Sequence, residues 1–472
     1  MAEEQRTSSN ERAPDGSEAA VPVVGGPHQK RNFTLGVMNG AFYMMAMAFI
    51  QPQIVLSAFA KQMTGTNVYA GLLSSVNMFT WRLPQLLVSR MVERRQRKMS
   101  VYILSSLLRV GAWVAICAIV LSASGLEKAT VFWIFFSLYV VAGLSSGLGG
   151  VPFQDIIGKT VPEQKLGSFF SMRVIVGRGG ALLSVTIAAF FILPRVGFPY
   201  NYGLLFVCYT ALAAMGTLAF WGVKEPPGTV VKKRRPWREL LLAGPRFLQE
   251  NAAFRGLFVY RAFRMMAMMA TPLYALYAGV DKTGGGRLAL FLYANLAAQM
   301  LGGVVANWIS GRWRPTVLMA VAASGSIMAP LLALASPYCR SETIIAFGSG
   351  SGALVLDGRD LAFVAVFVLN GISGIMGMIA ASAYLLTISP PKERPVCIAS
   401  FNTMLLPFFI IPRVAAGAMA DKWNYETAIA PCALFAVISL VFALRLAWSD
   451  RPPPATAPTA GSATTHPREA EG

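Results

Sequence analysis

The chain has 472 residues, of which 55% are hydrophobic and only 13% are charged. That proportion of charge is too low for a soluble protein of this length, so the composition indicates a membrane protein. The net charge of +19 is also typical of nucleic-acid-binding proteins. We exclude that function because the basic residues gather in the tails, the central linker and alternate loops between apolar stretches.

Long apolar stretches follow one another from Phe33 to Trp448. About 20 helical residues cross the hydrocarbon core of a bilayer, and these stretches lack the alternation of β-barrel strands. The sequence therefore predicts an all-α membrane protein with twelve transmembrane helices. We expect the helices at residues 33–58, 68–89, 100–122, 131–156, 168–193, 202–222, 256–279, 288–310, 316–336, 361–387, 396–419 and 427–446.

The two ends and the middle of the chain differ from the apolar stretches. Residues 1–32 and 447–472 are polar and rich in Gly or Pro, which predicts disordered tails without a cleavable signal peptide. Residues 223–255 carry the basic run Lys232 to Arg235, and apolar and charged residues alternate after it. This composition predicts a basic linker with a short amphipathic helix on the membrane surface. The positive-inside rule places both tails and the linker in the cytoplasm, with the protein in the cytoplasmic (inner) membrane.

A short string occurs twice, as FYMMAM at residues 42–47 and as FRMMAM at residues 263–268. Other landmarks recur in the same order, namely Thr64-Gly65 with Thr283-Gly284, Pro162 to Lys165 with Pro391 to Arg394, and Tyr200 to Tyr202 with Trp423 to Tyr425. These matches predict two homologous six-helix halves, residues 33–222 and 256–446, related by an axis along the membrane normal. The alternative is a chance echo among twelve unrelated helices.

The loop after the second span reads SRMVERRQRK, from Ser89 to Lys98. Ser89 and Glu93 share one helix face, so a neighbouring helix can approach at Ser89 and offer its positive N-terminal end to Glu93. The basic residues Arg94, Arg97 and Lys98 can pair with nearby acids. We interpret the cluster as a gate on the cytoplasmic side; a plain positive-inside loop is the alternative.

This loop resembles the signature G-x-x-x-D-R-x-G-R-[RK] of the major facilitator superfamily, with the acid replaced by Glu93 and the glycines by Ser89 and Gln96. A weaker echo after the eighth span keeps Gly303 and Arg312 but lacks the acid. The resemblance implies the fold of that family and transport by alternating access. It also implies that Asp155, at the cytoplasmic end of the fourth span, joins the gate.

The basic residues inside the predicted spans are all arginines, and no Asp or Glu lies away from the span ends. Each buried arginine needs a partner or a water-filled cavity, so the excess favours an anionic substrate group. We expect Arg264, aided by Arg261 on the same helix face, to face Tyr43 across the axis and contact the substrate first. The alternative is a structural arginine bound to backbone carbonyls. Further candidate contacts are Asn39, Gln51, Tyr274, Gln299, Arg178 and Arg109.

The sequence thus predicts a transporter of a small organic anion, or of an amphiphile with an anionic group. Two alternatives stay open, a multidrug exporter and a non-transporting assembly factor or receptor with the same fold. The spans hold no nucleophile–base set, so we do not expect an enzyme. Five cysteines without a CxxC pair and two histidines in the tails predict no metal, cofactor or disulfide framework. The expected partners are the substrate and the lipid bilayer, with the protein a monomer.

Overall fold

The structure is a computed structural model that describes residues 28–92, 95–227, 237–280, 285–310, 312–339, 343–347, 354–390 and 394–449. The first half of the described chain is helical. Its elements are α1 (Gln29–Phe49), the π-helical segment η1 (Pro52–Leu56), α2 (Ser57–Thr64), α3 (Asn67–Val92), α4 (Met99–Leu121), α5 (Lys128–Thr160), α6 (Glu163–Ile187), the π-helical segment η2 (Ala188–Ile192) and α7 (Tyr200–Trp221).

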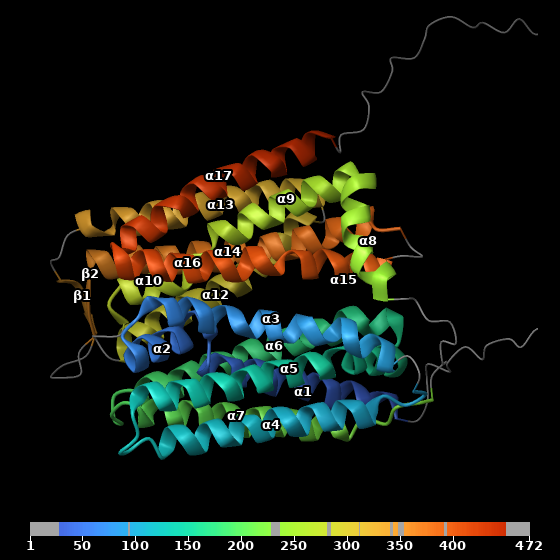
Figure 1. The fold of residues 1–472 in the computed structure, drawn as a ribbon, viewed down its shortest axis with the longest axis horizontal. Helices are drawn as coiled ribbons and strands as arrows, with labels where there is room; N and C mark the ends of the chain where they lie inside the picture. Colours follow the sequence, from blue (N-terminus) through green and yellow to red (C-terminus); the bar gives the residue numbers. More distant parts are fainter. Residues whose placement is uncertain are drawn as a thin grey trace, which may run out of the picture.

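The second half begins with a helix in the predicted linker. Its elements are α8 (Trp237–Glu250), α9 (Ala252–Ala267), α10 (Thr271–Tyr277), α12 (Gly285–Ser310), α13 (Pro315–Ala335), the 3-10 turn η3 (Ser336–Tyr338), the strands β1 (Thr343–Phe347) and β2 (Leu354–Asp357), α14 (Gly358–Ile388), α15 (Arg394–Met404), α16 (Leu406–Lys422) and α17 (Tyr425–Ser449). Figure 1 shows α1–α7 in the lower part of the molecule and α8–α17 in the upper part.

Ten helical segments of the described chain are long and apolar enough to cross a membrane. The predicted span at 68–89 is not among them because α3 carries polar residues such as Asn77 and Arg82. The span at 256–279 is not among them because it is divided into α9, with 16 residues, and α10, with 7. The chain is therefore a helical, multi-pass membrane protein.

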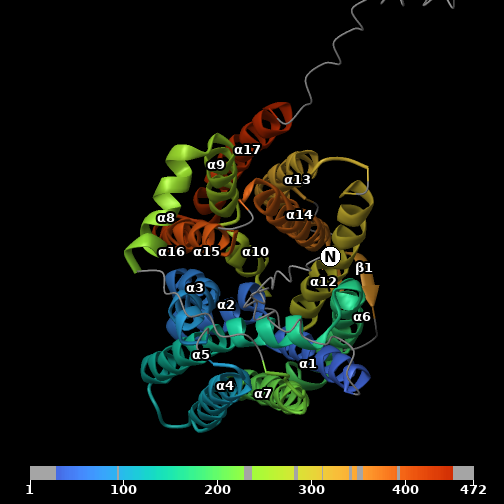
Figure 2. The same cartoon turned by 90° about the vertical axis from the view of Figure 1, so that its right-hand side faces the viewer.

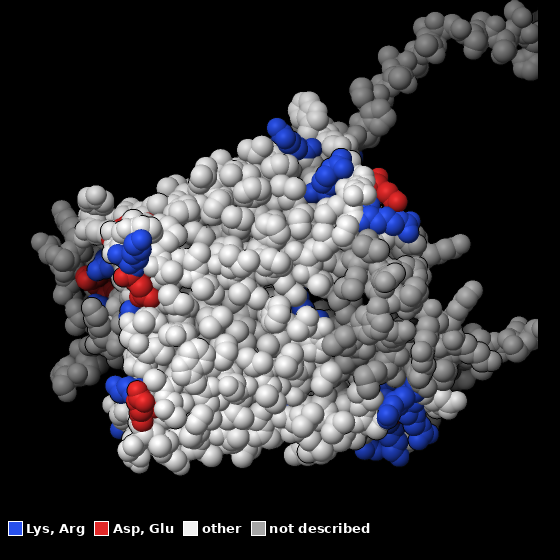
Figure 3. Space-filling model, in the orientation of Figure 1, with Lys and Arg blue, Asp and Glu red and all other residues white. Residues whose placement is uncertain are grey.

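The outer surface of the helices is apolar along most of its length. Leu107, Ile175, Val304 and Leu444 are between 53% and 69% exposed, and an exposed apolar surface this wide fits a lipid environment. Figure 3 shows this broad band without charged residues, with Lys, Arg, Asp and Glu at its two ends. We call the end with α8 the linker end and the end with β1 and β2 the hairpin end (Figure 1).

The two copies of the repeated string are followed by the same kind of helix break. After FYMMAM, α1 ends at Phe49 and η1 begins at Pro52. In the second copy, α9 ends at Ala267, the fifth residue of FRMMAM, and α10 begins just before Pro272. Proline lacks the N–H that would continue the helical ladder, so each break follows from its proline.

The same helix packings recur in the two halves. In the first half α1 packs on α6 and α7, α5 on α3 and α4, and α4 on α7. In the second half α9 packs on α16 and α17, α14 on α12 and α13, and α13 on α17. Between the halves, α3 contacts α16 and α6 contacts α12 (Figure 2).

The prediction of an all-helical chain is wrong in one detail, because β1 and β2 pair as an antiparallel hairpin before α14. Their segments, TIIAF and LVLD, are short apolar runs separated by a Gly- and Ser-rich stretch, which is the pattern of a hairpin. The helix expected in the linker is present as α8. It lies against α15, where a Cβ at Gly244 would come within 2.3 Å of Met404 Sδ.

Candidate functional site

Arg264 lies inside the second half of the molecule and not opposite Tyr43. Its side chain is 2% exposed. Nη1 donates to the carbonyl of Ala322 at 3.0 Å and to the hydroxyl of Ser326 at 2.7 Å, and Nη2 donates to the carbonyl of Ser373. These bonds tie α9 to α13 and α14 and give Arg264 the contacts of a structural arginine, which was the alternative to the predicted substrate contact.

Glycines make room for buried guanidinium groups in both halves. A Cβ at Gly377 would lie 2.4 Å from Nε of Arg264, and a Cβ at Gly40 would lie 2.1 Å from Nε of Arg173. Arg173, on α6, donates from Nη1 to the carbonyl of Gly36 at 3.2 Å and so holds α6 to α1. Arg264 and Arg173 therefore each join helices within their own half.

Tyr43 meets a different arginine. The guanidinium carbon of Arg109 lies 5.6 Å from the centre of the Tyr43 ring, a distance at which a cation and an aromatic ring attract each other. Nη2 of Arg109 donates to Thr217 Oγ1 at 2.9 Å. Two predicted contacts thus lie side by side, but both are in the first half, where they join α1, α4 and α7.

The predicted polar contacts also serve local structure. Asn39 is 7% exposed and donates to the carbonyl of Gly216 at 2.9 Å, which joins α1 to α7. Gln51 accepts from the backbone N–H of Gln53 at 3.1 Å and so caps η1. Tyr274 is 1% exposed within the apolar core.

Gln299 continues this pattern on α12. Its Nε2 donates to Asn295 Oδ1 at 2.5 Å, and Asn295 donates in turn to the carbonyl of Phe367 on α14 at 3.4 Å. This chain of bonds joins two helices of the second half, which is the common use of an amide inside a membrane protein.

Three other arginines have no acidic partner among the described residues. Arg82, on α3, donates from Nη1 to the carbonyl of Asn402 on α15 at 3.5 Å and so reaches across the two halves. Arg261, on α9, is partly exposed and makes no hydrogen bond or ion pair with the described residues. It is repelled electrostatically by Arg82 and Arg264. Arg178, on α6, is likewise partly exposed and unpaired within the described chain.

Acidic side chains do not compensate these arginines anywhere in the described residues. Asp155 pairs with Lys98 and Lys159, and Asp360 pairs with Arg287 at 3.0 Å. Both acids lie toward helix ends, and neither contacts Arg82, Arg178 or Arg261. Figure 3 shows Lys or Arg atoms at the bottom of a small hollow near the middle of the apolar band. The middle of the molecule therefore carries positive charge that the described protein groups leave unbalanced.

Part of the predicted gate assembles at the linker end. Lys98 Nζ lies 2.5 Å from Asp155 Oδ1, and Lys159 Nζ lies 2.6 Å from Asp155 Oδ2. Glu225, which was not among the predicted residues, belongs to the same network. Its carboxylate accepts from the backbone N–H groups of Lys98 and Met99 at 2.8 to 2.9 Å and thereby caps α4. This network joins α4, α5 and the start of the linker, all next to the first half, so it does not bridge the two halves.

The other predicted gate residues that the structure describes do not join this network. Glu93 and Arg94 lie outside the described residues, as does the side chain of Ser89. Arg97 is exposed. Outside its own stretch of helix, no described atom lies within 4 Å of the place where a Cβ at Gly303 would be, so no helix packs closely there. The guanidinium carbon of Arg312 lies over the ring of Trp308, 4.7 Å from its centre.

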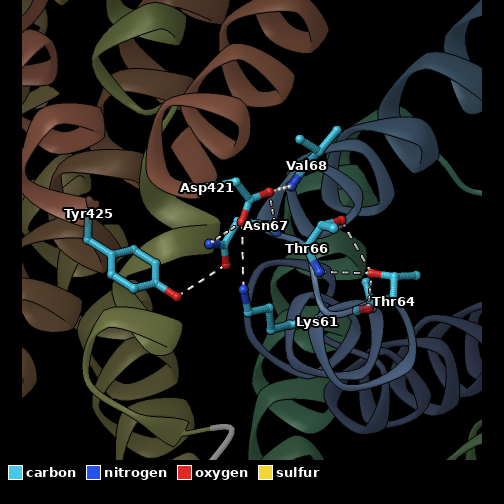
Figure 4. A network of polar contacts seen from close by, with 8 residues as sticks. Lys61, Thr64, Thr66, Asn67, Val68, Asp421 and Tyr425 are labelled. Carbon is cyan, nitrogen blue, oxygen red and sulfur yellow. Dashed lines mark hydrogen bonds and ion pairs between the residues drawn. The ribbon is translucent and has the colours of Figure 1, made fainter. Parts of the chain in front are cut away.

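A contact between the halves lies instead at the hairpin end. The Asp421 carboxylate, on α16, accepts from the backbone N–H of Asn67 at 2.7 and 2.9 Å, from Asn67 Nδ2 at 2.8 Å and from the N–H of Val68 at 3.1 Å. Tyr425 donates to Asn67 Oδ1 at 3.2 Å, and Lys61 Nζ lies 3.7 Å from Asp421 (Figure 4). The carboxylate thus caps the N-terminus of α3 from the other half.

The second seam between the halves is also joined toward the hairpin end. The hydroxyls of Thr186 on α6 and Tyr293 on α12 are hydrogen-bonded to each other. Both seams, α3 with α16 and α6 with α12, are therefore closed by polar contacts near this end. No group of three or more His, Cys, Asp or Glu that could hold a metal occurs among the described residues.

The fold is shared with solved membrane transporters. The nucleoside transporter NupG is 12% identical, with a TM-score of 0.63, and the match covers 88% of this chain and 98% of that one. A POT family transporter in complex with 5-aminolevulinic acid is 12% identical with a TM-score of 0.65, covering 88% and 96%. The peptide transporter POT in complex with sulfate is 12% identical with a TM-score of 0.62, covering 89% and 95%. Identities this low show the fold alone.

Two sequence comparisons complete the assignment. No curated protein matches the chain significantly. The family model of the Major Facilitator Superfamily matches residues 34–356, which is more than half of the chain. The chain therefore belongs to the Major Facilitator Superfamily of membrane transporters.

Proposed function

We propose that the protein is a secondary transporter with twelve spans in two related bundles that rock around a central site by alternating access. The recurring helix packings and the matching breaks after the repeated string support the two-bundle arrangement. The basic linker and tails support a cytoplasmic linker end and an external hairpin end. In this proposal the contacts of Asp421 and Thr186 lie on the external side.

For the substrate we propose a small organic anion, or an amphiphile with an anionic group, held by Arg261 with Arg82. The observation that carries this proposal is Arg261 itself: a guanidinium inside a predicted span, with two cationic neighbours and no partner among the described residues. A charge in that position is costly unless water or an anion compensates it. A carboxylate, phosphate or sulfate group can accept from both guanidinium groups at once.

Arg178 supports the same proposal from the opposite seam. It lies two helical turns before Thr186 on α6, and residues four apart share a helix face, so Arg178 and Thr186 face the same side. That side is the one in contact with α12. Sulfate in the complex of the peptide transporter POT supports the capacity of this fold to hold an anion.

The test measures ligand-induced thermal stabilisation of the purified protein with a panel of carboxylates, phosphates and sulfonates. We compare Arg261→Gln with Arg445→Gln, which removes the same charge from an exposed arginine on α17. An anion should stabilise the wild-type protein and the Arg445→Gln variant, and its effect should disappear in Arg261→Gln. Equal stabilisation of all three proteins would refute the assignment of Arg261.

Two further outcomes bear on the alternative functions. Stabilisation and transport of quaternary ammonium dyes, without any response to anions, would favour a multidrug exporter. A crosslink across the α3–α16 seam should abolish uptake or efflux in proteoliposomes. Unchanged biological activity of the crosslinked protein would instead favour an assembly factor or receptor.

A further inference from the structure

Arg413 is a buried arginine with unsatisfied nitrogen atoms. It lies in the middle of α16 and is 2% exposed. Its Nε and Nη1 have no hydrogen-bond partner in the structure, and among the described residues it makes no ion pair. The guanidinium carbon lies 3.7 Å from the centre of the Phe409 ring, one turn earlier on the same helix. An aromatic ring attracts a cation, but it offers no acceptor in the plane where the N–H groups of arginine point.

The residue lies where α3 and α16 touch backbone to backbone. A Cβ at Gly71 would be 2.3 Å from the carbonyl oxygen of Arg413, and a Cβ at Gly417 would be 2.4 Å from the carbonyl oxygen of Asn67. The two glycines thus bring the helices together on either side of the arginine's backbone. The backbone of Arg413 therefore lies at the seam between the halves, and its side chain is buried.

The acid nearest to Arg413 along α16 is already occupied. Asp421 lies eight residues later, about 12 Å along the helix axis. Its two oxygens accept four hydrogen bonds from Asn67 and Val68 (Figure 4). The seam therefore contains a satisfied carboxylate and, two turns away, an unsatisfied guanidinium.

We propose that Arg413 binds a small monovalent anion, a halide or a carboxylate, at the α3–α16 seam. A buried charge is stable when a counter-charge accepts its hydrogen bonds, and a monovalent anion balances one guanidinium. The ring of Phe409 covers one face of the guanidinium, so the anion is bound at its edge, through Nε and Nη1. This inference does not rest on the proposed substrate site, because Arg413 and Arg261 lie on different helices and each lacks a described partner of its own.

The experiment uses the full-length protein in detergent, dialysed into the sodium salt of a bulky sulfonate. Sodium chloride or sodium acetate is then titrated at constant ionic strength while the unfolding midpoint is recorded. A saturable rise with chloride indicates a halide, and one with acetate indicates a carboxylate. Arg413→Met should lose the rise, and in the sulfonate salt it should be at least as stable as the wild-type protein. Retained or increased stability in the sulfonate salt distinguishes an uncompensated charge from an arginine whose packing stabilises the fold.

Two controls keep the result interpretable. Arg413→Lys keeps the charge and should keep a weakened response, whereas Arg445→Gln, which removes an exposed arginine on α17, should respond as the wild-type protein does. A response lost only in Arg413→Met is therefore traced to Arg413 and not to a general loss of positive charge. The proposal is overturned if the wild-type midpoint is the same in all three salts, or if Arg413→Met responds like the wild-type protein. If Arg413→Met does not fold, binding to the wild-type protein is measured directly, by line broadening of the chloride NMR signal and by calorimetry with acetate. Absence of binding in both measurements overturns the proposal.

Discussion

The contact of Asp421 with the start of α3 offers the sharpest test of how the halves separate. Asp421→Asn keeps the shape of the side chain but removes its charge and one acceptor, and it turns an NH₂ group toward backbone donors. A hydrogen bond to a charged group contributes about 1.5–3 kcal/mol when buried. Asp421 is 26% exposed, so we expect a loss of about 2–3 kcal/mol from the four bonds together. That loss corresponds to about a 30- to 150-fold shift toward a state open at the hairpin end.

The shift can be measured as a distance between spin labels at the hairpin end. Leu126 lies between α4 and α5, Tyr338 follows α13, and the two are 45% and 91% exposed. With Cys208 and Cys339 replaced by serine, Leu126→Cys and Tyr338→Cys carry the labels. In the Asp421→Asn background the distance distribution should gain a longer component.

Lys61→Met provides a matched control for this prediction. Lys61 lies 3.7 Å from Asp421 in a partly exposed ion pair, and such pairs contribute about 0–1 kcal/mol. The Lys61→Met distribution should therefore stay close to that of the wild-type protein. The reasoning fails if Asp421→Asn leaves the distribution unchanged, or if Lys61→Met opens the molecule to the same extent.

Three stability predictions follow from close contacts and caps, each measured as a change in unfolding midpoint. Gly377→Ala places a Cβ 2.4 Å from the buried guanidinium on α9 and should cost about 1–3 kcal/mol, whereas Gly374→Ala, whose nearest atom is 3.7 Å away, should be neutral. Gly302→Ala meets the backbone of α14 at 2.8 Å and should destabilise, whereas Gly303→Ala faces open space and should not; the reverse order would contradict the packing. Glu225→Gln removes the charge that caps α4 and should cost about 1–2 kcal/mol; an unchanged midpoint would show that the cap contributes little.

The fold could be predicted from the sequence because a bilayer imposes strong constraints. Apolar length locates spans, and the linker helix follows from its alternating pattern. Pro52 and Pro272 are visible in the sequence after the two repeated strings. The structure adds that the helix is broken near each of them. The hairpin at 343–357 was missed because its strands are too short to stand out beside the spans.

The candidate site was harder to predict because a one-dimensional pattern locates a charge in a span without showing which way it points. Arg264 and Arg261 lie less than one helical turn apart on α9. Arg264 donates to two carbonyls and one hydroxyl, whereas Arg261 has no hydrogen-bond or ion-pair partner among the described residues. Likewise, Asp421 and Glu225 lie outside the predicted spans, so their role as caps on distant helices depends on tertiary structure. Pairing between segments far apart in sequence carries no local signal.

The donors that Asp421 engages have a consequence for how this sequence can change over time. Two of them are main-chain amides, which every residue except proline supplies. The start of α3 can therefore drift widely in side-chain identity while the attachment to α16 persists. A proline at position 68 would remove one of these amides, and few single replacements elsewhere in α3 would have the same effect.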